Sequence, residues 1–152
     1  MMTTILDHDL QEHMPDLSQF HSTKELEQSR LYQDLKPEIE AVLNGYELVN
    51  IIPVPEAHPF YRAVAWNVER GIHLEGINII LKKHPILKEA DILIITETDI
   101  GMARTGNRNI AKEMAEALGM NYFFAPSYIN LAKGSGTEQE FEGENNLGIH
   151  GN

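Results

Sequence analysis

Two apolar runs separated by one helical segment constrain this fold more than any other feature of the sequence. Residues 61–68 (YRAVAWNV) form a short apolar stretch, and residues 91–97 (DILIITE) form a continuous run rich in β-branched side chains. A run of the second kind is typical of a strand that is covered on both faces. Residues 76–84 lie between the two runs and carry an apolar helical face. The order strand, helix, strand predicts a parallel pair within an α/β fold.

The pattern continues after the second run. Residues 107–118 form an amphipathic helical segment that stops at Gly119, and residues 121–125 (NYFFA) are typical of a third strand. Residues 131–146 are rich in Gly, Ser and Glu and predict a mobile loop, while residues 147–152 begin another strand. We therefore expect a sheet with at least three partly parallel strands.

The first 60 residues differ in character and form a helical leader with a connector. Residues 1–22 show no clear period and predict a flexible start. Residues 23–44 have helical spacing of apolar residues, with a break or a fresh first turn at Pro37. Residues 46–60 contain three prolines and predict an extended connector with an edge strand at 48–52.

Charge is distributed unevenly along the 152 residues, a length that suits one domain. Residues 1–60 hold three bases and eleven acids, residues 61–134 nine bases and eight acids, and residues 135–152 four acids and no base. This acidity argues against a protein that coats nucleic acid, but not against a local phosphate site in the near-neutral middle. The absence of cysteine excludes disulfides and thiolate metal sites. With no signal peptide and no long apolar run, the sequence predicts a soluble cytoplasmic protein without membrane insertion.

Polar residues close the two strongest strands of the predicted sheet. Asn67 ends the first, and Glu97 ends the second. Parallel neighbours place such residues together at the carboxyl edge of a sheet, where α/β folds bind ligands. Carboxylate and amide oxygens are hard donors that suit Mg²⁺ or Mn²⁺. The alternative is that Asn67 caps a turn and Glu97 pairs with a nearby base.

Arginines follow the second strand, in a loop that leads into a helix at Asn107. Arg104 and Arg108, together with a helix N-terminus, favour a phosphate group. Alternatively, these arginines lie on the surface or pair with Asp99, which could itself orient Arg104.

Four strings occur in order along the chain: AVAWNVERG (63–71), ADILIITETD (90–99), GMARTGNRN (101–109) and GIHGN (148–152). In order and spacing they resemble motifs of the endonuclease/exonuclease/phosphatase superfamily, which includes exonuclease III-like nucleases, DNase I, inositol polyphosphate phosphatases and neutral sphingomyelinases. The resemblance covers roughly Tyr61 to Asn152, with Thr96 standing where the family more usually has Gln.

The resemblance implies a fold and a chemistry. Residues 61–152 would form the N-terminal half of a four-layer α/β sandwich of the DNase I type, preceded by the leader. The implied activity is Mg²⁺- or Mn²⁺-dependent hydrolysis of a phosphate ester, with Glu97 ligating the metal and Asn67 binding the metal shell or the scissile phosphate. We assign Arg104, Asn107 and Asn152 to substrate binding.

The family's general base lies beyond the last of these motifs, so we expect residues 1–152 to need the C-terminal half of the domain and to be inactive alone. The substrate could be a nucleic acid, an inositol phosphate or a phospholipid headgroup. The alternative function is a non-catalytic α/β binding module whose acidic leader docks a basic partner.

Overall fold

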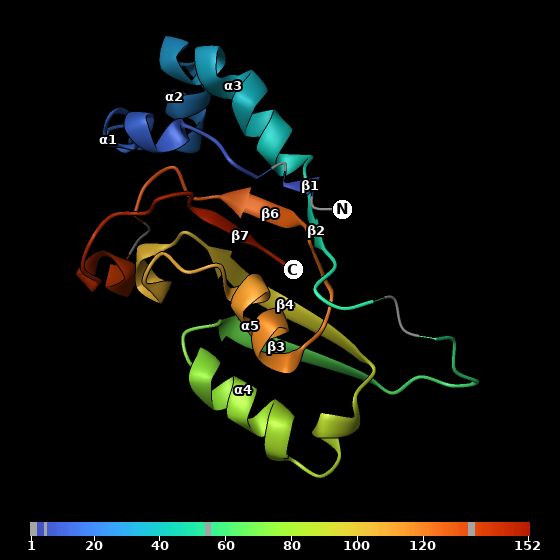
Figure 1. Ribbon diagram of the computed structural model, residues 1–152. Helices are drawn as coiled ribbons and strands as arrows, with labels where there is room; N and C mark the ends of the chain where they lie inside the picture. Colours follow the sequence, from blue (N-terminus) through green and yellow to red (C-terminus); the bar gives the residue numbers. More distant parts are fainter. Residues whose placement is uncertain (1–2, 5, 54–55, 134–135) are drawn as a thin grey trace.

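Helices and strands alternate along the chain in the computed structural model, which describes residues 3–4, 6–53, 56–133 and 136–152 (Figure 1). The chain is a mixed α/β protein. The helices are α1 (Met14–Leu17), α2 (Thr23–Gln28), α3 (Arg30–Leu43), α4 (Leu74–Lys83) and α5 (Ile110–Leu118), with short 3₁₀ helices at Leu10–His13, Leu87–Glu89, Ala103–Thr105 and Gly136–Glu140. The strands are β1 (Thr3–Thr4), β2 (Glu47–Val49), β3 (Ala63–Arg70), β4 (Ile92–Ile100), β5 (Tyr122–Phe124), β6 (Pro126–Ile129) and β7 (Ile149–Gly151).

The predicted parallel pair is confirmed. β3 and β4 pair in parallel, with Ala63 opposite Ile92 and Trp66 opposite Ile95, and α4 makes the crossover between them. Gly71 closes the turn after β3 with φ +80°, and a Cβ there would lie 2.3 Å from the Ile110 side chain. The turn therefore requires glycine.

The described residues cover β4 on one face, whereas the sequence predicts a strand covered on both. Both α4 and α5 pack on the face of the β3–β4 pair that carries Trp66 and Ile95, around the buried side chains Val68, Leu74, Ile77, Leu81, Ile110 and Met114. Side chains alternate along a strand, so Ile92 and Ile94 point to the other face, where they are 44% and 54% exposed.

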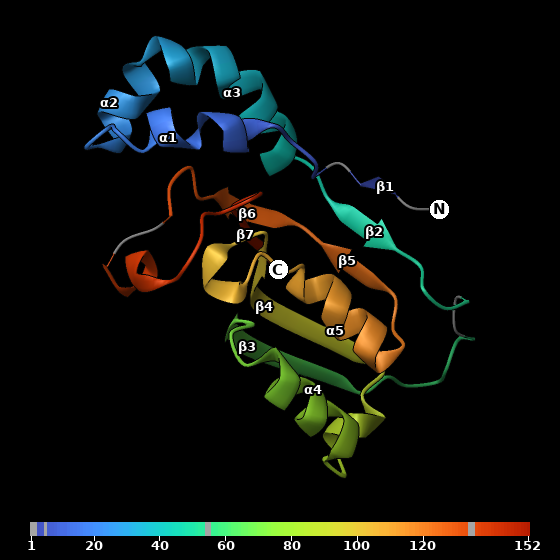
Figure 2. The same ribbon diagram turned by 60° about the vertical axis from the view of Figure 1, so that its left-hand side comes forward.

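The sheet that contains the β3–β4 pair has four strands and is partly parallel, as predicted, but the strand predicted at 121–125 is not one of them. The strands form two sheets, with orders β1-β2-β5 and β3-β4-β7-β6, and every pairing other than β3–β4 is antiparallel. The predicted third strand at 121–125 is β5, which pairs with β2. Only Ala125 separates β5 from β6, so these two strands follow one line that joins the two sheets (Figure 2).

The start of the chain is packed against the rest, contrary to the predicted flexible start. The side chains of Leu6, Leu10, Met14 and Leu17 are at most 8% exposed. His8 Nε2 lies 2.7 Å from the carbonyl oxygen of Leu147, at the far end of the sequence. The predicted leader also includes residues 1, 2, 5, 54 and 55, which lie outside the described residues.

The helical segment after this start breaks at Ser29 and not at Pro37. Ser29 has an extended ψ of 149°, and its Oγ accepts the N–H of Tyr32 at 3.1 Å to cap α3. Pro37 lies inside α3. The strand predicted at the sheet edge, β2, instead lies between β1 and β5, because the start of the chain returns to cover it.

The glycine-rich loop at 131–146 is held by Asn145, whose side chain is buried. Its Oδ1 accepts the N–H of Ala103 at 2.8 Å, and its Nδ2 donates to the carbonyl of Ala132 at 2.9 Å. The last segment forms β7, as predicted. Among the described residues, no helix is both long and apolar enough to cross a membrane.

Candidate functional site

The pairing of β3 and β4 is interrupted where the predicted site residues lie. Asn67 is opposite Thr96, and the next pair is Arg70 opposite Thr98, so β3 has one more residue than β4 in this interval. This is a β-bulge, a feature that bends a strand and redirects its side chains. The bulge separates the regular core of the sheet from its carboxyl end.

Three non-glycine residues in the bulge have left-handed backbone. The φ angles are 49° for Glu69, 66° for Arg70 and 60° for Glu97. Each such residue costs on the order of 1–3 kcal/mol, and such residues gather at functional sites. No sequence signal marks these positions, because glutamate and arginine do not favour this conformation.

A chain of hydrogen bonds joins both strand ends to the end of β7. Asn67 Nδ2 donates to Glu97 Oε1 at 2.6 Å, and Asn67 Oδ1 accepts the N–H of Glu69 at 2.9 Å. The N–H of Glu97 donates to Asn152 Oδ1 at 3.1 Å, and Asn152 Nδ2 donates to Ser127 Oγ at 3.2 Å. The structure therefore brings together three of the predicted site residues, Asn67, Glu97 and Asn152.

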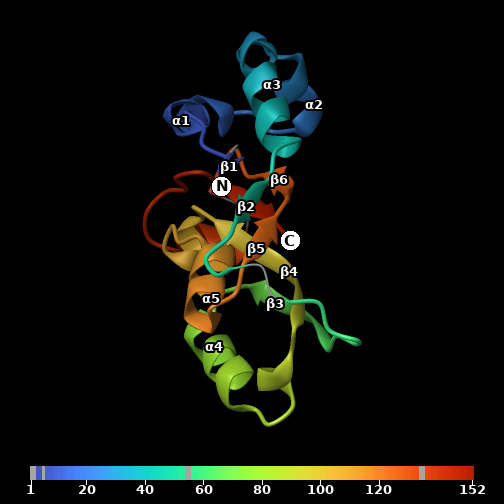
Figure 3. The same ribbon diagram turned by 45° about the vertical axis from the view of Figure 1, so that its right-hand side comes forward.

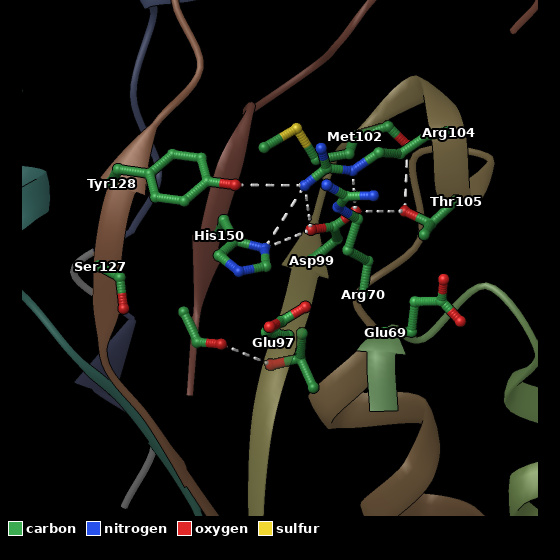
Figure 4. A network of polar contacts seen from close by, with 12 residues as sticks. Glu69, Arg70, Glu97, Asp99, Met102, Arg104, Thr105, Ser127, Tyr128 and His150 are labelled. Carbon is green, nitrogen blue, oxygen red and sulfur yellow. Dashed lines mark hydrogen bonds and ion pairs between the residues drawn. The ribbon is translucent and has the colours of Figure 1, made fainter. Parts of the chain in front are cut away.

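A buried ion pair lies next to Glu97 (Figure 4). Arg104 donates from Nε to Asp99 Oδ2 at 2.8 Å and from an Nη to Asp99 Oδ1 at 2.9 Å. The two side chains are 3% and 0% exposed. A second Nη of Arg104 contacts Glu138, which also lies 3.2 Å from Arg70. This matches the alternative in which Arg104 pairs with Asp99.

Burial and hydrogen bonding shift the pKa values of Asp99 and Arg104 in opposite directions. Burial alone would raise the pKa of Asp99, but hydrogen bonds from Arg104 and His150 outweigh it and hold the pKa below its usual value. Burial likewise works against the charge of Arg104, whereas bonds to Asp99 and Tyr128 raise its pKa. Both groups are therefore charged across the physiological range.

His150 completes the cluster from β7. Its Nδ1 lies 2.7 Å from Asp99 Oδ1, and its ring stacks on Tyr128 with centroids 4.7 Å apart. No local pattern in the sequence assigns His150 to this cluster. Its position follows from the long-range pairing of β7 with β4, which is antiparallel and sets His150 opposite Asp99.

The other predicted residues lie in different surroundings. Asn107 donates to the carbonyl of Glu144 at 2.9 Å and accepts the N–H of Asn146 at 3.0 Å, so it ties two loops together. Arg108 pairs with Glu75 and Glu113. In this arrangement Arg104 and Asn107 make intramolecular contacts, and their role in substrate binding stays a prediction.

The described residues contain no group of three or more His, Cys, Asp and Glu side chains that could hold a metal. The carboxylates near the bulge explain this. Asp99 is used by Arg104 and His150, which leaves Glu97 and the exposed Glu69 as the carboxylates at the bulge, and the Glu97 carboxylate accepts a hydrogen bond from Asn67. An ion held by Glu97 alone would have one carboxylate ligand and would depend largely on water to complete its shell.

No protein-family model matches this sequence, and comparison with curated proteins and with solved structures likewise gives no match.

Proposed function

We propose that this chain carries the metal and phosphate site of a Mg²⁺-dependent phosphoesterase of the endonuclease/exonuclease/phosphatase superfamily. The supporting observation is the 2.6 Å hydrogen bond from Asn67 to Glu97 at the carboxyl end of the parallel pair. A carboxylate on strained backbone, held by a neighbouring amide, is arranged to present its free oxygen to a ligand. Ligands of α/β sheets bind at this edge.

The donor chemistry at the bulge fits Mg²⁺ or Mn²⁺. Glu97 would hold the ion, and Asn67 would align the carboxylate through its amide nitrogen, with its oxygen next to the ion's water shell. Mg²⁺ uses few protein carboxylates and keeps several waters, so a single glutamate is compatible with it. When bound, the ion would polarise a phosphoryl oxygen and stabilise its developing charge.

Neutral donors beside Glu97 suit a phosphate ester. The amide of Asn152 and the hydroxyl of Ser127 lie in contact with each other at the end of β7 and the start of β6, and Asn152 is bonded to the Glu97 backbone. We infer that they contact substrate oxygens. The positive charge of Arg104 lies beneath this surface, in the ion pair with Asp99.

The same proposal includes the four-layer sandwich fold. The open face of β3 and β4, which carries Ile92 and Ile94, is apolar enough to pack against another layer. A second sheet on this face would give the four-layer sandwich that the motifs imply.

Metal binding tests the proposal without relying on turnover. Mn²⁺ would be titrated into the chain and followed by electron paramagnetic resonance, with competition by Mg²⁺. We expect Glu97→Gln to weaken binding more than about tenfold and Asn67→Ala to weaken it about tenfold, as removal of an orienting neighbour does. Glu69→Gln is the matched control, because Glu69 is an exposed carboxylate in the same bulge. Equal binding by the parent chain and Glu97→Gln would refute the proposed site.

A non-catalytic binding module is the second candidate. The observation in its favour is the excess of acid in residues 1–60, much of it on the exposed surfaces of α2 and α3. If this candidate is correct, the parent chain binds a lysine-rich peptide in a salt-dependent way and shows no Mn²⁺ binding in the same titration.

A further inference from the structure

A cavity of about 870 Å³ lies between the start of the chain, β2 and the N-terminal end of α5. In Figure 3, β1 and β2 lie between the helices α1 to α3 above and α5 below. A cavity of this size suits a small organic molecule. None of its described lining residues belongs to the bulge at Glu97, so the cavity is separate from the site described above.

Glu47 places a buried carboxylate in this cavity. The residue is 5% exposed. Its Oε1 accepts hydrogen bonds from the hydroxyl of Tyr122 and, at 3.3 Å, from Nδ2 of Asn109. No Lys, Arg or His among the described residues forms an ion pair with this carboxylate. Because charged side chains are rarely buried without a partner, this carboxylate is arranged to take a cation from solution.

The second oxygen of this carboxylate, Oε2, is open to the cavity. Among the described residues, the one fully buried side-chain polar atom without a partner is Oδ1 of Asn78. Oε2 of Glu47 also has no partner among these residues, so it is not fully buried, and Glu47 lines the cavity. A ligand in the cavity can therefore donate a hydrogen bond to Oε2.

Acids outnumber bases on the wall of the cavity. Asp7 and Asp9 are exposed and line it together with the buried carboxylate, whereas Lys112 is the one base of the described lining. His8 adds no charge, because its Nδ1 accepts the N–H of Leu10 at 3.2 Å and its Nε2 therefore carries the ring proton. Three acids and one base give the described lining a net charge of −2. The cavity therefore attracts a ligand with more than one positive charge.

The negative charges do not converge on one point. The described residues contain no group of three or more His, Cys, Asp and Glu side chains that could hold a metal ion, so Asp7, Asp9 and Glu47 do not surround a single ion. The apolar side chains of Leu6 and Ile100 lie on the same lining. A ligand that uses the whole cavity therefore has positive groups joined by apolar spacers.

We propose that the cavity binds a linear aliphatic polyamine. One ammonium group would donate to Oε2 of Glu47, and a second would lie beside Asp7 and Asp9 at the exposed end of the cavity. An ammonium group has three donors and no acceptor, which matches a carboxylate oxygen that lacks a donor. The methylene spacers would pack on Leu6 and Ile100, as the stems of lysine side chains do on apolar surfaces.

Equilibrium dialysis with radiolabelled spermidine tests the proposal. The buffer contains about 0.15 M salt, in which charges more than about 8 Å apart are largely screened. We expect Glu47→Gln to weaken binding at least about tenfold, because a neutral amide replaces the charged partner of a buried ammonium group. Glu40→Gln is the matched control. Glu40 is an exposed acid of α3 outside the cavity, so its loss should change binding less than about twofold.

A second variant keeps the buried carboxylate. Asp7→Asn combined with Asp9→Asn changes exposed side chains only, so it leaves the packing of the chain intact. We expect this double variant to bind spermidine about fivefold more weakly than the parent chain. Butylamine, which has one ammonium group, should bind equally to both. The difference separates a ligand with several charges from a single cation.

Two results would overturn the proposal. One is the absence of saturable spermidine binding by the parent chain. The other is equal weakening by Glu47→Gln and Glu40→Gln, because binding would then reflect the formal net charge of −11 and not the cavity. Neither result bears on the proposed metal site. Glu47→Gln should bind Mn²⁺ like the parent chain, because no described lining residue of the cavity belongs to the bulge.

Discussion

The imidazole Nδ1 of His150 lies 2.7 Å from the carboxylate Oδ1 of Asp99, across the antiparallel pair of β7 and β4. Asn152 lies two residues after His150, and Glu97 lies two residues before Asp99. The side-chain oxygen of Asn152 accepts the N–H of Glu97. The Asp99–His150 contact therefore sets the register that brings Asn152 to the strained glutamate. The polar cluster is a structural support for the candidate site.

Removing the charge of Asp99 should be strongly destabilising. In Asp99→Asn the guanidinium of Arg104, 3% exposed, would lose its buried anionic partner. We expect a loss of about 3–5 kcal/mol in the free energy of unfolding, measured by urea denaturation. The double variant Asp99→Leu with Arg104→Met removes both charges and should recover most of it. A loss below about 1 kcal/mol in Asp99→Asn would contradict the role of this pair.

The same carboxylate should make stability depend on pH. Its pKa is lower in the folded chain than in the unfolded chain, where aspartate titrates near pH 4. The folded state therefore binds fewer protons, and the contribution of Asp99 is fully present above about pH 5 and is lost as the pH falls through its folded pKa. Urea denaturation between pH 6 and pH 2 would measure this. Asp99→Asn should show a flatter decline, and an identical slope in both proteins would argue against the shift.

Local patterns were enough to predict part of the site. The residues Asn67 and Glu97 end two strands that one helix connects, and parallel pairing then places both at one edge whatever the rest of the chain does. Short apolar runs predicted β3 and β4, and apolar residues at helical spacing predicted α4 and α5.

Long-range contacts decided the features that the sequence did not predict. Leu10 is fully buried, yet the segment around it has no period, because its partners come from elsewhere in the chain. The residues of β5 are typical of a strand and do not indicate which sheet it joins. Its pairing with β2 places it in the sheet β1-β2-β5. The left-handed conformation of Glu97 depends on Asn67 and Asn152, which lie 30 and 55 residues away.

The backbone strain at Glu97 predicts an inverted order of stability for two small substitutions. In an ordinary strand, alanine is more stable than glycine by roughly 0.5–1 kcal/mol. At φ 60°, a Cβ costs energy that glycine avoids. We expect Glu97→Gly to be more stable than Glu97→Ala by about 1 kcal/mol in urea denaturation, while both lose the carboxylate. Greater stability of the alanine variant would show that this backbone is relaxed.

The close approach of β7 to the line of β5 and β6 predicts that Gly151 tolerates no side chain. A Cβ at this position would lie 2.1 Å from the carbonyl oxygen of Ala125 and 2.8 Å from the Phe124 ring. Gly151→Ala must therefore push β7 away from its neighbour, and overpacking of this kind costs about 1–3 kcal/mol. The displacement would also carry Asn152 away from Glu97, so Mn²⁺ binding should weaken together with stability.

Gly76→Ala is the matched control, because Gly76 lies within α4 and a Cβ there would meet nothing within 4 Å. That variant should gain about 0.5–1 kcal/mol and bind Mn²⁺ like the parent chain. A Gly151→Ala variant as stable as the parent would contradict the close contact between β7 and Ala125.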